Sequence, residues 1–166
     1  ERWPWLMINL CTAFIASRFI SVFEDTIQQL VALAALMPIV ASVGGNTGNQ
    51  TAALVIRGLA MEQIQRGNLA YIYRKEMIIS LLNGLIWGAV LGLFAWALYS
   101  NLLLGAVMMA AVTLNLLLAA LIGITVPFLL DRFNKDPAMG SSVVLTFATD
   151  SMGFFLFLGL ATLILV

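Results

Sequence analysis

Five long apolar runs follow one another along the chain and restrict it to a small set of folds. A transmembrane helix needs about 20 predominantly apolar residues, and each run is close to that length. An amphipathic segment at residues 51–64 either continues the second run as a helix or forms a short helix at the membrane surface. The pattern predicts an all-α integral membrane protein, organised as a single transmembrane domain over residues 1–166. The five predicted spans cover residues 3–23, 26–43, 77–99, 102–130 and 141–166.

Composition supports this class and excludes several others. Hydrophobic residues make up 62% of the chain and charged residues only 10%, whereas a soluble domain is about half apolar and about a quarter charged. The net charge is zero, so the chain offers no basic field to a nucleic acid. Histidine is absent and Cys11 is the only cysteine, which excludes a disulfide within one chain and any Cys/His zinc site.

The basic residues predict how the chain is oriented in the membrane. Seven of the eight lysines and arginines lie on one side of the predicted spans, and such a bias marks the cytoplasmic side. The amino end is then cytoplasmic and the carboxyl end extracytoplasmic in a multi-pass protein of the plasma (inner) membrane. The seven residues are Arg2, Arg57, Arg66, Arg74, Lys75, Arg132 and Lys135.

A single acidic residue, Asp150, lies within the fifth predicted span. A carboxylate near the middle of the bilayer costs roughly 2.5–3.5 kcal/mol on insertion scales, and such groups normally face a bundle interior or water. Ser142, Thr146 and Asp150 recur at four-residue intervals, so they form a polar stripe on one face of a helix, and Gly153 is expected to extend it. The alternative is a protonated Asp150 that is hydrogen-bonded to a neighbouring helix.

The segment GGNTGNQ at residues 44–50 is the second polar feature. Asn46, Asn49 and Gln50 offer neutral carbonyl oxygens, and the glycines are expected to interrupt the helix and leave backbone carbonyls accessible. Irregular backbone at membrane depth occurs only where it is buried in protein or lines a cavity, although a plain cytoplasmic turn would also suit this composition. Oxygen-only ligands favour hard divalent cations, and Mg²⁺ prefers to keep several of its waters.

Glycines also mark a helix contact in the third predicted span. Gly84, Gly88 and Gly92 are spaced four residues apart, and small residues at this spacing allow two helices to approach closely in lipid. The sequence therefore predicts a tightly packed partner for this span.

Four segments carry a specific combination of residues over nearly the whole chain. They are FEDTIQQLVALAALMPIVASVGGNTGNQTAALVIRGLA (23–60), RKEM (74–77), VPFLLDRFNKDPAMGSS (126–142) and ATDSMG (148–153). In these segments the chain resembles the membrane domain of the MgtE family of magnesium channels and transporters.

The resemblance implies a homodimer whose pore lies at the dimer axis and is lined by the second and fifth helices. It implies that Asp150 holds a hydrated magnesium ion at the constriction, with the Thr146 backbone carbonyl nearby. It places Asn46, Asn49 and Gln50 towards the cytoplasmic part of the path. Family members also carry cytosolic sensor domains, including paired CBS modules, which are absent from these 166 residues and are expected in the full-length protein.

The expected function is therefore conduction of hydrated Mg²⁺ into the cytoplasm, with Mn²⁺, Co²⁺ and Ca²⁺ as further candidate ions. A cation-coupled divalent metal exchanger is the alternative that the sequence leaves open. An intramembrane aspartyl protease would need two carboxylates that share a proton, and only Asp150 lies within a predicted span, so no enzymatic activity is expected. A structural subunit without transport activity is the remaining alternative.

Overall fold

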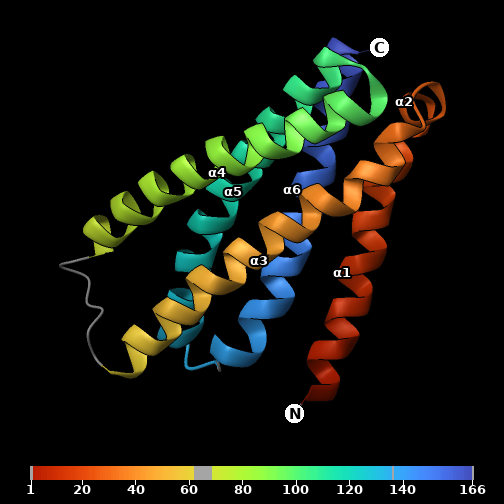
Figure 1. Cartoon of the computed structure of the whole chain (residues 1–166). Coiled ribbons are helices and arrows are strands. Elements are labelled where there is room, and N and C mark those ends of the chain that lie inside the picture. The colour runs from red at the N-terminus through yellow and green to blue at the C-terminus, as the bar shows by residue number, and fades with distance from the viewer. Residues whose placement is uncertain (1, 62–68, 136, 166) are drawn as a thin grey trace.

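A computed structural model describes residues 2–61, 69–135 and 137–165, and in these ranges the chain is helical with no strand. The expected all-α fold is confirmed. Figure 1 shows five long helices and one short helix that connects the first two long ones. The helices are α1 (Arg2–Val22), α2 (Glu24–Gln29), α3 (Ala32–Ala60), α4 (Leu69–Tyr99), α5 (Leu102–Arg132) and α6 (Pro137–Ile164).

Four of the helices are long and apolar enough to cross a membrane. They are α1, α4, α5 and residues Gly140–Ile164 of α6. The helix α3 has 29 residues, which at 1.5 Å per residue is also enough for a bilayer, but its polar residues lower its hydropathy. A crossing by α3, and therefore a total of five spans, stays a prediction.

The expected interruption at GGNTGNQ is wrong. The helix α3 runs without a break from Ala32 to Ala60, so the backbone carbonyls of this segment lie within a helix. The amphipathic segment that begins at residue 51 continues α3 as far as Ala60, and residues 62–64 lie outside the described residues. The break in this part of the chain comes earlier, at Leu30 and Val31, where α2 ends and α3 begins.

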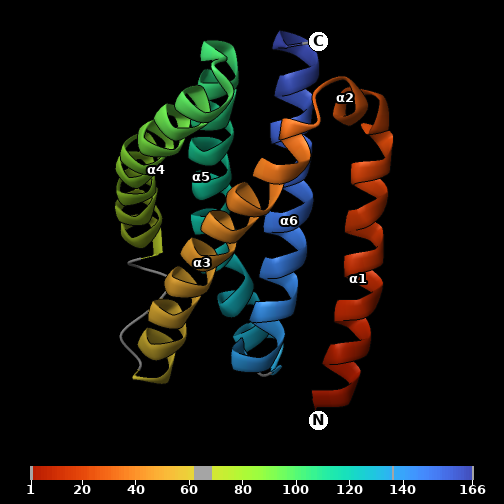
Figure 2. The same cartoon turned by 45° about the vertical axis from the view of Figure 1, so that its right-hand side comes forward.

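Successive long helices alternate in direction, and the two ends of the chain lie at opposite ends of the bundle (Figure 2). The start of α1, the end of α3 and the end of α5 lie near the amino-terminal end, whereas the start of α4 lies about halfway along the bundle. Six of the seven basic residues assigned to one side of the spans belong to these segments or to the α5–α6 connection. Arg66, the seventh, lies outside the described residues.

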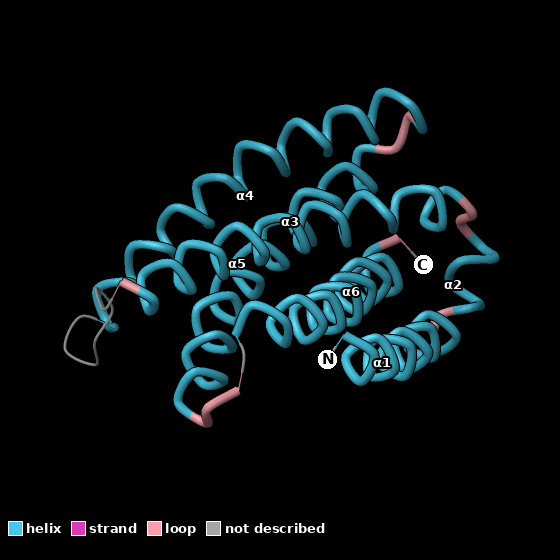
Figure 3. The backbone as a smooth tube through the Cα atoms, turned by 90° about the horizontal axis from the view of Figure 1, so that it is seen from below, coloured by secondary structure: helices cyan, strands magenta, loops and turns pink. Residues whose placement is uncertain are grey.

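The helix α5 forms the centre of the bundle, and α1 lies at its edge. The view from below in Figure 3 places α5 beside α3, α4 and α6, with α1 against α6. In the most apolar stretch of each helix, 61% of the α5 residues are buried but only 6% of the α1 residues. Met108 and Leu116 of α5 and Leu33 of α3 pack with Phe157 of α6 in the main core.

The expected close approach at Gly84, Gly88 and Gly92 is confirmed. A Cβ added at Gly84 would lie 2.8 Å from the Cα of Thr113, and one at Gly92 would lie 2.7 Å from the Gly105 carbonyl oxygen. Both distances are shorter than a carbon atom tolerates, so only glycine lets α4 and α5 pack this closely.

A second seam of small residues joins α3 to α5. A Cβ added at Gly48 would lie 3.1 Å from a methyl carbon of Leu145 and 3.6 Å from the Ala119 carbonyl oxygen. A Cβ added at Gly123 would lie 2.9 Å from the Gly48 carbonyl oxygen. Gly48 therefore allows α3 to pack closely against its neighbours, and this packing outweighs the roughly 1 kcal/mol that a glycine costs inside a helix.

Candidate functional site

The helix α6 carries the acidic residue, and its polar stripe runs between α1 and α3. Two cavities flank the first turns of this stripe, one of about 310 Å³ against α1 and one of about 370 Å³ against α3. Ser142 lines both cavities, so this part of α6 is open to each side. The two cavities and the surface between them are called the α6 groove below.

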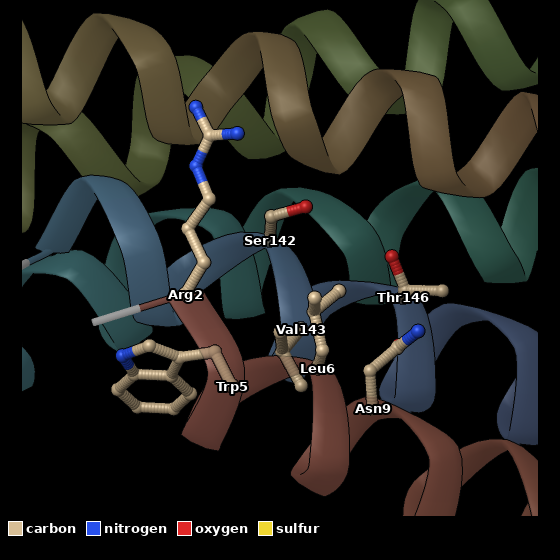
Figure 4. Close-up of a pocket in the computed structure, with 7 residues that line it drawn as sticks. All are labelled: Arg2, Trp5, Leu6, Asn9, Ser142, Val143 and Thr146. Carbon is tan, nitrogen blue, oxygen red and sulfur yellow. The ribbon is translucent and has the colours of Figure 1, made fainter.

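On the α1 side, the groove is lined by both polar and apolar side chains, and one of them is the charged Arg2. Figure 4 shows Ser142 and Thr146 on successive turns of α6, with Trp5, Leu6 and Asn9 of α1 beside them. The Thr146 carbonyl oxygen lies within α6 and accepts a long hydrogen bond of 3.4 Å from the Thr149 hydroxyl. Thr146 lines this cavity, and its carbonyl oxygen already accepts a hydrogen bond within the helix.

On the α3 side, hydroxyl and amide groups face one another. Asn49 and Arg57 of α3 line this cavity together with Ser141 and Ser142 of α6. Ser141 is 2% exposed, and its Oγ makes no hydrogen bond to the described residues. The exposed Asn49 side chain thus adds an oxygen to the same groove as the polar stripe.

Asp150 lies one turn beyond Thr146 on α6 and is partly buried. Its neighbour Thr149 is fully buried and donates a hydrogen bond of 2.8 Å to the Leu145 carbonyl oxygen. A Cβ added at Gly45 of α3 would lie 3.7 Å from the Thr149 hydroxyl oxygen. The structure therefore brings the glycine segment of α3 next to the turn of α6 that carries Asp150.

Gly153 does not continue the polar stripe as expected. It is buried, and a Cβ added there would lie 2.9 Å from the amide nitrogen of Asn115 on α5. Three residues along a helix turn the side-chain direction by about 300°, which is enough to move Gly153 from the groove to the core.

The three amide residues of α3 do not share one environment. Asn49 lines the α6 groove, whereas Asn46 and Gln50 line a separate cavity of about 300 Å³ with Asn83 and Trp87 of α4. All three amide side chains are exposed. Asn49 is thus the amide that the structure brings together with the polar stripe.

The donor set of one chain suits a hydrated cation. Among the described residues, no three Asp, Glu, His or Cys side chains gather closely enough to hold a metal ion. The α6 groove instead offers hydroxyl and amide oxygens, with one arginine in each cavity, Arg2 or Arg57. Asp150 lies on the same helix two turns beyond Ser142, outside both cavities. Such weak oxygen donors suit a hard divalent cation that keeps several waters.

Sequence reasoning missed Asn115, which is 0% exposed in the middle of α5. Its signal was present, because it is the one amide residue between residues 102 and 130, and polar side chains inside apolar spans usually have a specific partner. Asn83 was also missed, although it carries the same signal as the one amide residue between residues 77 and 99. Ser141 was missed as well, and nothing in its local sequence sets it apart from other single polar residues.

Comparison with known proteins agrees with the resemblance to the MgtE family that the sequence shows. The family model MgtE, described as a divalent cation transporter, matches residues 37–160. The chain is 33% identical to the magnesium transporter MgtE of Bacillus subtilis over 162 residues, which are 98% of this chain and 36% of that protein. It is 35% identical to the magnesium transporter MgtE of Thermus thermophilus over 165 residues, which are 99% of this chain and 36% of that protein.

The chain therefore spans 36% of the length of these relatives. A third relative, the magnesium transporter MgtE of Enterococcus faecalis, is 26% identical over 163 residues. The matched family segment includes Asn46, Asn49, Gln50, Thr146 and Asp150. With the family model matched from residue 37 to residue 160, this chain belongs to the MgtE family of divalent cation transporters.

Proposed function

We propose that this chain is the membrane domain of a magnesium transporter and that it conducts hydrated Mg²⁺ into the cytoplasm between two copies of itself. The observation that carries the proposal is the α6 groove, where hydroxyl and amide side chains line α6 on the turns that precede Asp150, the single acidic residue in the predicted spans. The groove lies on the outside of one chain. In a bilayer it would face lipid unless another protein surface covered it.

A second copy of the chain would cover the α6 groove from lipid and would supply a second carboxylate for the ion. Polar side chains at membrane depth are costly when they face lipid, and a two-fold dimer would enclose the grooves of both copies. Two Asp150 carboxylates would then balance the two charges of one Mg²⁺ ion, and the ion would relieve their mutual repulsion. Two-fold dimers are the commonest symmetric oligomers.

The proposed path assigns a role to each predicted site residue. Asp150 attracts the ion at the constriction, and Thr146 and Asn49 contact its water shell through their oxygens. Asn46 and Gln50 lie in the neighbouring cavity against α4, so their part is smaller and concerns the cytoplasmic end of the path. A water-filled path with few direct ligands suits Mg²⁺, because this ion loses its waters reluctantly.

The membrane potential is sufficient to drive inward movement. Each charge gains about 2.3 kcal/mol per 100 mV, so a divalent ion gains about 4.6 kcal/mol without a coupling ion. The amino end is cytoplasmic in this proposal, because the basic ends of α1, α3 and α5 lie at that end of the bundle. Cytosolic sensor domains, including CBS modules, would precede this domain in the full-length protein and regulate the path.

The test replaces the carboxylate and keeps the shape of the side chain. The protein is reconstituted in liposomes that contain a magnesium-sensitive dye, and uptake is started with a potassium diffusion potential, negative inside. We expect Asp150→Asn to lower the initial Mg²⁺ flux at least tenfold. Equal flux through wild type and a correctly inserted Asp150→Asn variant would refute the proposal.

Asp131→Asn is the matched control. It makes the same chemical change at an exposed position in the last turn of α5, a helix that lines neither cavity of the α6 groove. Its flux should stay within twofold of wild type. Repeating the assay with sodium gradients in either direction distinguishes a channel from a sodium-coupled exchanger, since only the exchanger would respond.

A further inference from the structure

Asn115 of α5 is buried at the junction of the two helices that line the proposed path. It is 0% exposed, and its Nδ2 donates a hydrogen bond of 3.2 Å to the Val40 carbonyl oxygen of α3. The amide thus makes a polar contact in an otherwise apolar part of the bundle. The contact ties α5 to the α3 turn that precedes GGNTGNQ.

Two glycines, one from each path helix, make room for this amide. A Cβ added at Gly44 of α3 would lie 2.2 Å from Asn115 Nδ2, and one added at Gly153 of α6 would lie 2.9 Å from the same atom. Asn115 therefore fills a gap that exists because neither helix has a side chain at that point. Its size sets how closely α3 and α6 approach one another there.

The amide is not explained by packing alone. Its Oδ1 is buried and accepts no hydrogen bond from the described residues, and an unpaired buried acceptor destabilises a fold. Leucine has a similar branched shape and would fill much of the same space without that cost. Buried polar groups retained in this way fix a specific arrangement in several proteins.

The glycines on either side of the contact are buried, but they lie close in sequence to predicted site residues. Gly153 follows Asp150 by three residues on α6, and Gly44 precedes Asn49 by five residues on α3. We propose that Asn115 is a positioning residue that sets the selectivity of the path between Mg²⁺ and Ca²⁺, and this inference rests on the proposed function. Asn115 holds α3, which carries Asn49, at a fixed spacing from α6, which carries Asp150. The width of the path, and hence its preference for Mg²⁺ over Ca²⁺, follows from this spacing.

Selectivity is the readout that separates positioning from simple stability. A variant that only folds less well loses Mg²⁺ and Ca²⁺ flux in the same proportion, so the ratio of the two stays constant. We expect Asn115→Ala to change the Mg²⁺ to Ca²⁺ flux ratio at least fivefold in liposomes. Asn115→Leu, which keeps the volume but removes the hydrogen bond, should change the ratio less than Asn115→Ala.

Gly88→Ala provides the matched structural control. It also perturbs α5, but from the α4 side, where the added Cβ would lie 3.0 Å from the Met109 carbonyl oxygen. It should lower the amount of folded protein and leave the flux ratio within twofold of wild type.

Cross-linking in native membranes measures the helix spacing without transport. In a Cys11→Ala background, cysteines replace Gly45 and Thr149, where a Cβ at position 45 lies 3.7 Å from the Thr149 hydroxyl oxygen. We expect oxidation to join them readily in the wild-type context and at least fivefold more slowly with Asn115→Ala. This measurement requires only membrane insertion, so it covers a variant that is too unstable to purify.

The outcomes distinguish this inference from the proposed function. If wild type conducts Mg²⁺ and Asp150→Asn does not, the proposed function stands. If Asn115→Ala then leaves both the flux ratio and the cross-linking rate within twofold of wild type, only the positioning role of Asn115 is refuted. If Asn115→Ala is not inserted, Gly153→Ala replaces it, because its Cβ displaces the same amide from the α6 side. An unchanged ratio and rate in Gly153→Ala would then refute the inference.

Discussion

The packing of Asn115 against Gly44 makes a quantitative prediction about stability. In Gly44→Ala, the new methyl group would lie 2.2 Å from Asn115 Nδ2 and 2.9 Å from its Cγ. Contact between these atoms is impossible at such distances, so the amide must move. Because α6 packs against the other side of Asn115 at Gly153, the amide has little room, and its hydrogen bond to Val40 is lost.

The expected magnitude follows from three opposing contributions. Overpacking of a filled core costs about 1–3 kcal/mol, and a buried amide left without its partner costs about 1–3 kcal/mol. Alanine regains about 1 kcal/mol over glycine in a helix. The net loss is about 3 kcal/mol, which corresponds to a fall of about 6–12 °C in the melting temperature of a chain of this size.

Gly159→Ala is the matched control for this substitution. It makes the same change in α6, but no heavy atom lies within 4 Å of the added Cβ. Only the gain in helix propensity remains, so this variant should melt at the wild-type temperature or slightly above it.

The assay compares purified variants in one detergent by the loss of the folded elution peak after heating. The double variant Gly44→Ala/Asn115→Ala should regain part of the lost stability, because the smaller side chain at position 115 no longer meets the methyl group. Equal melting temperatures for Gly44→Ala and Gly159→Ala would contradict the close contact on which the estimate rests.

Three further predictions concern the path itself. With 100 mV across the liposome membrane and no sodium, Mg²⁺ should accumulate towards a concentration ratio of about three powers of ten, since a divalent ion gains about 4.6 kcal/mol; a strict need for sodium would favour the exchanger. Asn49→Leu should lower Mg²⁺ flux about tenfold and Gln50→Leu only about twofold, because only Asn49 lines the α6 groove; a larger effect of Gln50→Leu would reverse this order. In a Cys11→Ala background, an impermeant maleimide should label Ser100→Cys on intact cells and Lys135→Cys only after permeabilisation; the opposite pattern would invert the proposed orientation.

The sequence predicted the helices well, because long apolar runs leave the backbone few other ways to satisfy its hydrogen bonds in a bilayer. The predicted third span began at residue 77, whereas α4 begins at Leu69. The difference arises because Arg74, Lys75 and Glu76 extend the helix beyond the apolar run. Hydropathy detects the continuous apolar run, and these charged residues separate the apolar first turn of α4, residues 69–72, from that run.

The glycine segment was misinterpreted because glycine is a poor helix former when judged alone. The contact of Gly48 with α5 depends on a residue far away in sequence, so local preference could not reveal it. The amides were grouped because they are neighbours in sequence, but successive residues on a helix point about 100° apart. That rotation places Asn49 and Gln50 in different cavities. The role of Asn115 likewise depends on two distant glycines.

The central place of α5 has a practical consequence for anyone who wishes to alter the proposed transport activity. If the proposed function holds, a random mutant library screened for growth on scarce magnesium would contain many inactive clones with changes in α5, although no predicted ligand lies on that helix. Those clones should not be interpreted as evidence that the cargo touches α5. The same helix offers a starting point for retuning ion preference, because substitutions there reshape the route and leave every group that meets the ion chemically intact.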